Sequence, residues 1–251
     1  MSELLARVLA SAERDGPVTD IRVGTHWTIV AAELPGGPGA GLASTQSVHG
    51  AEHGTPAVRD AGRLIGRSAR ELAGWVQSNQ LTERSIGFAA LNALIQVDEA
   101  QCVDLNAGDL ITARGAGHSV AIVGHFPFVE QVRAAARQCW VLELNPGPGD
   151  VPASLAAEVL PQADVVALTG MTLVNGTFDS LHALCRPDAY TLLLGATTPL
   201  SPLFFDLGLS AISGTILTDI PAALLAVSQA ATFRQIPGRR LVTMLRPAGE
   251  A

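Results

Sequence analysis

Two patterns of hydrophobic and polar positions follow each other along the chain. In the first part, residues 21–33 are rich in β-branched and aromatic residues, the Gly/Pro-rich stretch 34–41 indicates a turn, and residues 41–48 favour a second strand. Helical patterns follow at 61–76 and 82–95. A hairpin followed by helices predicts a small α+β unit.

From residue 119 onward, short apolar runs alternate with helix-sized segments. Parallel strands read as continuous apolar runs because helices bury both faces of their sheet. The alternation therefore predicts an α/β, Rossmann-like sheet of about five parallel strands with helices on both faces. The predicted strands are SVAIVG (119–124), WVLEL (140–144), DVVALTG (164–170), YTLLLG (190–195) and LSAISG (209–214).

The apolar periodicity lapses between the two parts, over residues 106–117. This lapse is typical of a linker. The sequence therefore predicts two domains, an α+β domain over residues 1–110 and a Rossmann-like α/β domain over residues 111–251.

The composition excludes several classes of protein. The sixteen basic residues are all arginine, so chemistry that needs a lysine, such as pyridoxal phosphate catalysis or a P-loop, is absent. The net charge is −7 and the arginines are scattered, which argues against a nucleic-acid partner. No Gly-rich pyrophosphate-binding turn follows the strand at 119–124, so a dinucleotide is not favoured and the cofactor stays open.

The chain carries no sign of export or of a membrane span. Its first fourteen residues mix charged and apolar positions, which is typical of an amphipathic helix rather than a signal peptide. No uncharged apolar run reaches the roughly 18 residues of a membrane helix. Three widely spaced cysteines fit reduced thiols, so we expect a cytoplasmic protein. The oligomeric state stays open, and a homo-oligomer is compatible with the sequence.

Candidate site residues follow the first two strands of the second part. In parallel sheets, ligands bind beyond the carboxyl ends of the strands. Gly124 and His125 follow the first strand, and His125 is either an acid/base group or a cap of the next helix. Glu143 ends the second strand, nineteen residues past Gly124, close to the spacing of about 20 at which an acid accepts ribose hydroxyls. A bond to its own turn is the alternative, and Asp150 is interpreted as a helix N-cap.

Two later loops carry small and polar residues that suit a polar ligand. The alternative for all of them is a role in caps and turns. They are Thr169, Gly170, Asn175 and Thr177 after the third strand, and Thr197 and Thr198 after the fourth. Asp219 precedes Ile-Pro and is interpreted as the N-cap of the last long helix.

Two polar residues of the first part share one predicted helix. Glu83 and Asn92 are nine residues apart and therefore on opposite sides of a regular helix. Glu83 is either a site residue or a first-turn carboxylate that the helix dipole favours. Asn92 either contacts ligand or ties the helix to a neighbouring loop.

Residues 49–53 match the H-x-x-E-H pattern of inverted zinc peptidases. Gly50, Gly54 and Pro56 argue against the helix that this motif needs, so we do not expect a catalytic zinc site. In a loop, His49 or His53 could contact a ligand or a metal.

Seven stretches together resemble a known family over nearly the whole chain. They are GTHWTIV, GLAST, SNQLTERSIGFAALNAL, VAIVGHFPFV, VLELNPGPGDVP, LPQADVVALTGMTLVNGT and GATTPLSPLFFDLGLSAISG. The family is a bacterial and archaeal one of unknown function called the "putative heavy-metal chelation" domain. The resemblance implies an enolase N-terminal-like domain followed by a Rossmann-like domain, with a site between them and partial similarity to methyltransferases. It also implies condensation or hydrolysis of flavin-, pterin- or siderophore-like molecules.

We therefore predict a small-molecule enzyme without a permanent redox cofactor. Glu143 would anchor the ligand, and His125 or Glu83 would move the proton. Two alternatives stay open: a non-catalytic protein that binds a metal chelate through His49 and His53, and a methyltransferase-like protein that binds S-adenosylmethionine.

Overall fold

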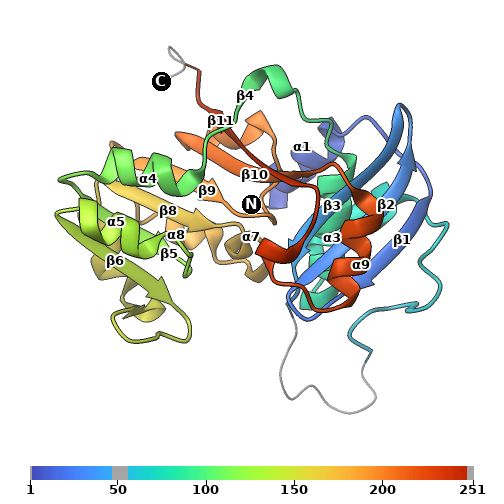
Figure 1. Ribbon diagram of the computed structural model, residues 1–251, viewed down its shortest axis with the longest axis horizontal. Coiled ribbons are helices and arrows are strands. Elements are labelled where there is room, and N and C mark those ends of the chain that lie inside the picture. Colours follow the sequence, from blue (N-terminus) through green and yellow to red (C-terminus); the bar gives the residue numbers. More distant parts are fainter. Residues whose placement is uncertain (1, 47–55, 248–251) are drawn as a thin grey trace. The chain divides into compact units, whose positions relative to one another are not determined.

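The computed structural model describes residues 2–46 and 56–247, which form two compact units (Figure 1). Unit 1 comprises Met1–Asp98, Ala196–Leu203 and Gly214–Arg240. Unit 2 comprises Glu99–Gly195, Phe204–Ser213 and Leu241–Ala251. The proposed domains, 1–110 and 111–251, are consecutive blocks of sequence, whereas the compact units are not, because the chain passes repeatedly between them after residue 195.

Unit 1 contains a three-stranded antiparallel sheet with the strand order β1-β2-β3. Helix α1 (Ser2–Ser11) comes first, followed by β1 (Val18–Val23), β2 (Trp27–Leu34) and β3 (Gly37–Ser44). The prediction of one strand over 21–33 is wrong, because the chain turns at Gly24, whose N–H donates to the carbonyl of Trp27 at 2.9 Å. The prediction of a turn after this region is confirmed, although β3 begins within the glycine-rich stretch.

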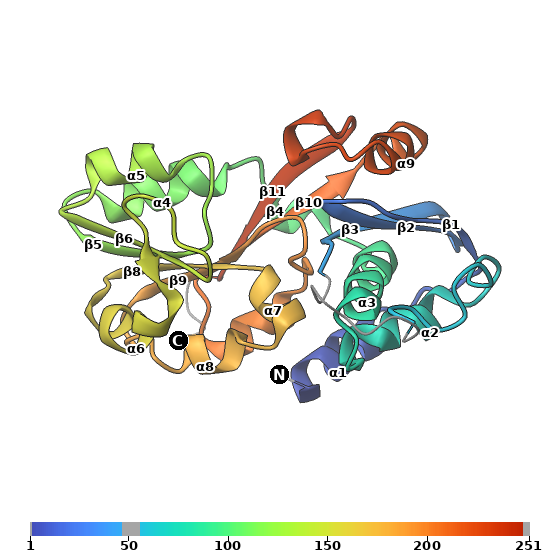
Figure 2. The same ribbon diagram turned by 90° about the horizontal axis from the view of Figure 1, so that it is seen from below.

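Helices cover both faces of this small sheet (Figure 2). Helix α3 (Leu81–Leu94), predicted at 82–95, lies on one face, and α9 (Ile220–Ser228) lies on the other. The predicted helix at 61–76 is shorter than expected, since only α2 (Ala69–Ala73) and the 3₁₀ turn η1 (Gly74–Gln77) are helical. The N-cap of α2 is Ser68, whose hydroxyl accepts a hydrogen bond from the N–H of Glu71, so the helix starts there.

Asp219 is the N-cap of α9, as predicted, and its Oδ1 accepts a hydrogen bond from the N–H of Ala222 at 3.1 Å. Asp219→Ala should therefore lower the free energy of unfolding by about 1 kcal/mol, the usual loss for an N-cap. Urea denaturation measures this change. Asp219→Asn is the matched control, because Asn caps a helix about as well as Asp; an equal loss in both variants would contradict the capping role.

The larger sheet has eight strands in the order β4-β11-β10-β9-β8-β5-β6-β7. The five predicted strands are all present and pair in parallel with one another in the order β10-β9-β8-β5-β6; the two-residue β7 continues the parallel arrangement at one edge. β4 pairs antiparallel with β11. The strands are β4 (Cys102–Val103), β5 (Ser119–Val123), β6 (Gln138–Glu143), β7 (Val151–Pro152), β8 (Val165–Thr169), β9 (Tyr190–Leu194), β10 (Ala211–Leu217) and β11 (Arg239–Leu245).

Helices cover both faces of the parallel strands in unit 2 (Figure 2). α4 (Ala107–Gly115) and α5 (Val129–Ala135) lie on one face, and α6 (Ala156–Val159) and α8 (Phe178–His182) lie on the other. Helix α7 (Met171–Asn175) follows β8 directly. Short 3₁₀ turns complete the described elements: η2 (Glu99–Gln101), η3 (Ala153–Leu155), η4 (Leu160–Gln162), η5 (Pro202–Leu207) and η6 (Phe233–Gln235).

The prediction of a linker over 106–117 is wrong, because most of this stretch is helix α4. Asn106 is its N-cap, and its side chain accepts a hydrogen bond from the N–H of Gly108 at 2.8 Å. The buried residues of this short helix are Gly108, Leu110, Ile111 and Gly115, and only two of them are large and apolar, so the apolar periodicity is too brief to recognise.

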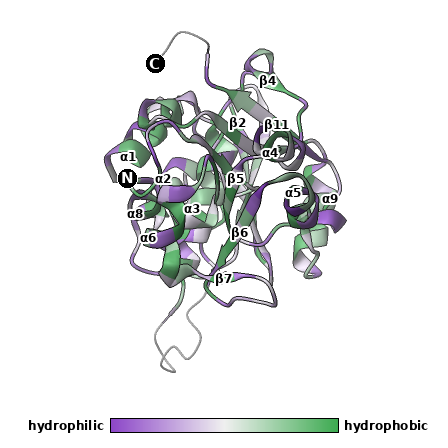
Figure 3. Ribbon diagram, turned by 90° about the vertical axis from the view of Figure 1, so that its left-hand side faces the viewer, coloured by the Kyte–Doolittle hydropathy of each residue, from purple (hydrophilic) through white to green (hydrophobic). Residues whose placement is uncertain are grey.

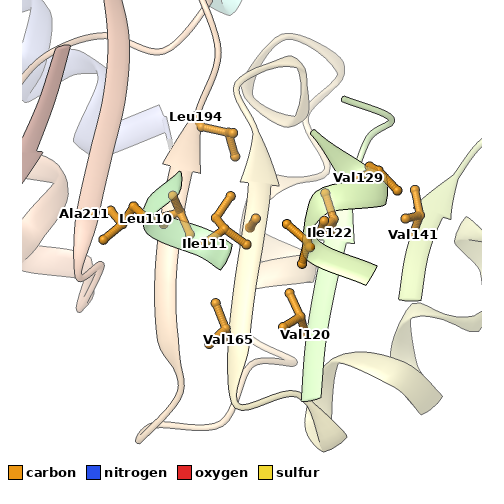
Figure 4. Close-up of a cluster of buried hydrophobic side chains, with 12 residues drawn as sticks. Leu110, Ile111, Val120, Ile122, Val129, Val141, Val165, Leu194 and Ala211 are labelled. Carbon is orange, nitrogen blue, oxygen red and sulfur yellow. The ribbon is translucent and has the colours of Figure 1, made fainter. Parts of the chain in front are cut away.

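The core of unit 2 fixes α4 and α5 on the parallel strands. Figure 4 shows Leu110 and Ile111 of α4 beside strand side chains such as Val165 and Ile122, and Figure 3 shows β5 in the colour of hydrophobic residues. Each fully buried aliphatic side chain contributes roughly 1.5–3 kcal/mol. This packing holds the strand ends in place, and the candidate residues follow those ends.

Candidate functional site

Gly124 begins the turn that carries His125 beyond the end of β5. Its φ of +101° favours glycine. A Cβ on Gly124 would lie 3.1 Å from the Cβ of Thr169, so the turn packs closely against the end of β8. The N–H of Gly124 donates to the carbonyl of Leu142 in β6 at 3.0 Å. The residues after β5 and β8 therefore meet at one edge of the sheet, as the sequence predicts.

The imidazole of His125 pairs with the carboxylate of Asp150. The Nδ1 of the imidazole lies 3.2 Å from Oδ2 of Asp150. The imidazole side chain is 52% exposed and the Asp150 side chain only 4%. The interpretation of Asp150 as a helix N-cap is wrong, since β7 follows it and the next helical turn begins after Pro152.

Asp150 is held by groups from two segments of unit 2. Its Oδ2 accepts a hydrogen bond from the N–H of Gly147 at 3.1 Å, and Nη2 of Arg133 lies 3.3 Å from its Oδ1. Burial by itself would raise the pKa of the Asp150 carboxyl, but the bonds from Gly147 and His125 and the charge of Arg133 outweigh it and lower the pKa. Asp150 is therefore ionised near neutral pH.

Both carboxylate oxygens of Glu143 accept backbone hydrogen bonds. Oε1 accepts from the N–H of His125 at 2.6 Å, and Oε2 accepts from the N–H of Leu144 at 3.2 Å. Glu143 thus ties the end of β6 to the turn after β5. A carboxylate oxygen can accept a further bond, so the role of Glu143 as a ligand anchor stays a prediction.

The other predicted ligand contacts of unit 2 form bonds within turns or to the neighbouring strand β9. The N–H and hydroxyl of Thr177 donate to Oδ1 of Asn175, at 3.1 and 2.7 Å. The N–H of Gly170 donates to the carbonyl of Leu194 at 2.7 Å. The N–H of Met171 donates weakly to the hydroxyl of Thr169, at 3.4 Å. These bonds fit the alternative of caps and turns, and contact with a ligand stays a prediction.

In unit 1, Asn92 connects α3 to the segment 196–203. Its Nδ2 donates to the carbonyls of Leu42, Ala196 and Thr197 at 2.9, 3.3 and 3.2 Å, as expected if it ties the helix to a loop. The hydroxyl of Thr197 accepts from the N–H of Ser44 at 2.9 Å. Oδ1 of Asn92 and Oγ1 of Thr198 are buried and find no hydrogen-bond partner within residues 2–46 and 56–247.

Glu83, also in unit 1, is a buried carboxylate surrounded by donors. Arg59 binds it through its backbone N–H at 2.7 Å and through Nε and Nη2 of its guanidinium. The hydroxyl of Ser78 donates to Oε2 at 2.6 Å. Burial opposes ionisation, but the bonds from Arg59 and Ser78 outweigh it, and the pKa of Glu83 lies below its ordinary value. This arrangement favours an anchoring role; transfer of a proton by Glu83 stays a prediction.

The predicted site residues thus belong to both units. Glu83, Asn92, Thr197 and Thr198 belong to unit 1; Gly124, His125, Glu143, Thr169, Gly170, Asn175 and Thr177 belong to unit 2. His49 and His53 lie outside the described residues. Within residues 2–46 and 56–247, no group of three or more His, Cys, Asp or Glu side chains could hold a metal ion. In the same part of the chain, no helix combines the length and apolar character of a membrane span.

Sequence reasoning missed Asp150 and Arg133. Asp150 contacts the imidazole of His125 directly, and Arg133 is linked to the imidazole through Asp150. The signal for Asp150 was present, since the Gly/Pro-rich stretch 145–149 can fold the chain back toward the strand end that it has just left. Arg133 gave no such signal. Helix α5 carries two charged residues, Glu130 and Arg133, and only the tertiary structure decides which one reaches the next loop.

The fold defines a class: a mixed α/β protein that combines a small antiparallel sheet with a larger, mostly parallel sheet flanked by helices. Residues 106–246 match the family DUF364, described as "Putative heavy-metal chelation", and residues 6–95 match DUF4213, which has the same description. The chain belongs to the DUF364 family, and the resemblance found in the sequence is confirmed.

Similar proteins cover almost the whole chain. A protein of Methanocaldococcus jannaschii described as uncharacterized is 27% identical over 247 residues, which are 95% of this chain and 93% of that protein. A crystal structure of a DUF364 protein of unknown function from Desulfitobacterium hafniense is 28% identical, with a TM-score of 0.81 and 97% of both chains covered. A second one, from Pyrococcus horikoshii, is 21% identical with a TM-score of 0.80, covers 97% of this chain and 100% of that one, and is similar in fold.

Proposed function

We propose that this protein is an enzyme that moves a proton on a polar small molecule at the strand ends of unit 2, with His125 as the acid/base group. One observation carries the proposal: a half-exposed imidazole is paired through Nδ1 with a buried, ionised carboxylate, that of Asp150. A carboxylate that orients a histidine in this way is the arrangement that general acid/base catalysis uses.

The position of this pair supports a ligand-binding role. It lies beyond the carboxyl ends of β5 and β6, where parallel sheets bind their ligands. An imidazole that only capped a helix would not need a buried acid, whose ionisation is costly unless other groups compensate for it. Gly147 and Arg133 provide this compensation.

The resemblance suggests the class of substrate: a flavin-, pterin- or siderophore-like compound that is condensed or hydrolysed. In this proposal Glu143 anchors the ligand, and Gly124, Thr169, Gly170, Asn175 and Thr177 supply further polar contacts. Within unit 1, Glu83 is the proposed acid/base group. Asn92, Thr197 and Thr198 are the proposed ligand contacts of that unit.

Replacement of His125 tests the function. The protein is incubated with a panel of pterins, flavins and siderophores, and conversion is followed by mass spectrometry. His125→Gln should lower turnover by about 10²–10⁴-fold, the usual contribution of an acid/base group. His26→Gln removes an exposed histidine of unit 1 and is the matched control. Equal turnover in wild type and His125→Gln would remove this assignment.

The family description favours a second candidate, a protein that binds a metal chelate without transforming it. The described residues do not form a chelating group for a bare metal ion, so we derive no step through a metal. His49 and His53 are the proposed contacts. Titration with Ni²⁺ or Zn²⁺, free and as a siderophore complex, should then show stoichiometric binding that is lost in the double variant His49→Gln/His53→Gln. Metal or chelate binding that survives in the double variant would contradict this second candidate function.

A further inference from the structure

Three charged side chains hold His125 or its partner Asp150, and they come from three different segments of unit 2. Glu143 ends β6, Asp150 precedes β7 and Arg133 belongs to α5. We infer that these three are positioning residues that fix His125 in one orientation and one tautomer, with the proton on Nδ1 and the lone pair on Nε2 available to a ligand. The inference rests on the proposed function and specifies how the imidazole performs it.

The backbone of His125 is bonded to the neighbouring strand. Two successive backbone N–H groups donate to β6: that of Gly124 to the carbonyl of Leu142 at 3.0 Å, and that of His125 to Oε1 of Glu143 at 2.6 Å. A short bond to a carboxylate is among the stronger hydrogen bonds in proteins. The backbone that carries the imidazole is therefore held on the neighbouring strand.

The imidazole ring of His125 is held in one tautomer by Asp150. The carboxylate of Asp150 is ionised, so it has no proton to give and can only accept. At 3.2 Å, the neutral imidazole satisfies this contact only with its proton on Nδ1. Nε2 is then the unprotonated nitrogen, and the half-exposed ring leaves it accessible. The tautomer follows from the charge of its partner.

The loop that carries Asp150 is attached to α5 by Arg133. Nη2 of Arg133 donates to the carbonyl of Gly149 at 2.9 Å and lies 3.3 Å from Oδ1 of Asp150. Nη1 of Arg133 also pairs with Glu130 at 2.8 Å. Arg133 thus attaches the loop to α5 and keeps a positive charge beside the buried acid. The charged groups near His125 are then Asp150 and Glu143 directly, and Arg133 and Glu130 behind them.

The arrangement implies the direction of the first chemical step. Nε2 forms a bond to a proton of the ligand, the bond between that proton and its ligand nitrogen or oxygen breaks, and the electron pair stays on the ligand. The resulting imidazolium is stabilised by the negative charge of Asp150. The ligand must therefore present an N–H or O–H group whose conjugate base can be stabilised, as in a cyclic amide, a phenol or a hydroxamate.

NMR of the full chain with ¹⁵N-labelled histidine tests the tautomer without any substrate. The signals of His125 are assigned by their loss in His125→Gln. In wild type above neutral pH we expect the Nδ1–H form, with Nε2 in the chemical-shift range of an unprotonated nitrogen. Asp150→Ala should remove this preference and produce a mixture with the Nε2–H form. Arg137→Met, which removes an exposed arginine at the start of β6, should leave the tautomer unchanged.

An Nε2–H tautomer in wild type, or an unchanged tautomer in Asp150→Ala, would overturn the inference. If Asp150→Ala does not fold, the comparison of wild type with Arg133→Met tests the inference instead. The ¹³C-detected titration of Asp150 should show a higher carboxyl pKa in Arg133→Met than in wild type. An equal pKa in the two proteins would contradict the role of Arg133. Asp150→Ala should also lower turnover by about 10²–10⁴-fold. Unchanged turnover in His125→Gln would remove the proposed function and the inference with it, whereas the wrong tautomer removes the inference alone.

Discussion

Gly87→Ala should destabilise the protein by roughly 2 kcal/mol or more, although alanine is the better helix former by about 1 kcal/mol. Gly87 lies in α3, where the helix crosses η1. A Cβ at this position would be 2.4 Å from the backbone nitrogen of Val76 and 2.6 Å from the carbonyl carbon of Trp75. Backbone atoms cannot rotate away, so the cost lies at the upper end of the about 1–3 kcal/mol of overpacking, or above it.

Urea unfolding followed by tryptophan fluorescence measures the change, with Gly74→Ala as the matched control. Gly74 has helical dihedral angles, and a Cβ there would meet nothing within 4 Å. Gly74→Ala should therefore stabilise by about 0.4–1 kcal/mol through the entropy of the unfolded chain. Equal stability of wild type and Gly87→Ala would show that α3 and η1 do not pack as closely as described.

Arg59→Met should lower the free energy of unfolding at neutral pH by about 2–3 kcal/mol. Among the described residues, it leaves Glu83, whose side chain is 4% exposed, with the Ser78 hydroxyl and one backbone N–H as donors. Loss of one partner of a buried pair costs about 3–5 kcal/mol, and the 55% exposure of the Arg59 side chain reduces that value. Arg67→Met is the control, because its pairs with Asp60 and Glu71 lie at the surface, where ion pairs contribute little to stability.

The effect of Arg59→Met should depend on pH. The pKa of Glu83 is lower in the folded than in the unfolded state, so its ion pair stabilises the fold above the unfolded-state pKa. This stabilisation is lost as the pH falls through the folded-state pKa, below the ordinary range of a glutamate. Unfolding curves of wild type and Arg59→Met should therefore converge at acid pH, and a difference that is constant down to pH 3 would contradict the role of this pair.

The sequence predicts the buried strands well and the short elements poorly. Strands such as β5 and β8 are recognised because both of their faces are covered, so four consecutive positions in each are apolar. The sequence of helix α4 is typical of a linker, since its amphipathic pattern is brief. The break between β1 and β2 at Gly24 was also missed, because one glycine between β-branched residues fits a bulge as well as a turn.

The candidate site was only partly predictable for a related reason. His125 and Glu143 were found because a strand-helix alternation determines which residues follow the strand ends. The contacts of these two residues were not predictable. Glu143 binds the backbone of His125, and the ring of His125 pairs with Asp150. These contacts depend on how the loop 144–150 folds back, and local sequence does not determine this path.

The sequence by itself determined the succession of apolar strands and helices and the family, because burial on a sheet constrains each residue independently of distant partners. Only the tertiary structure decided that residues 196–203 and 214–240 join unit 1, that Asp150 pairs with His125 and that Arg133 pairs with Asp150. These features depend on pairs of residues that lie far apart along the chain. Their contact energies arise only when the whole chain has folded, so the pattern of a single segment does not record them.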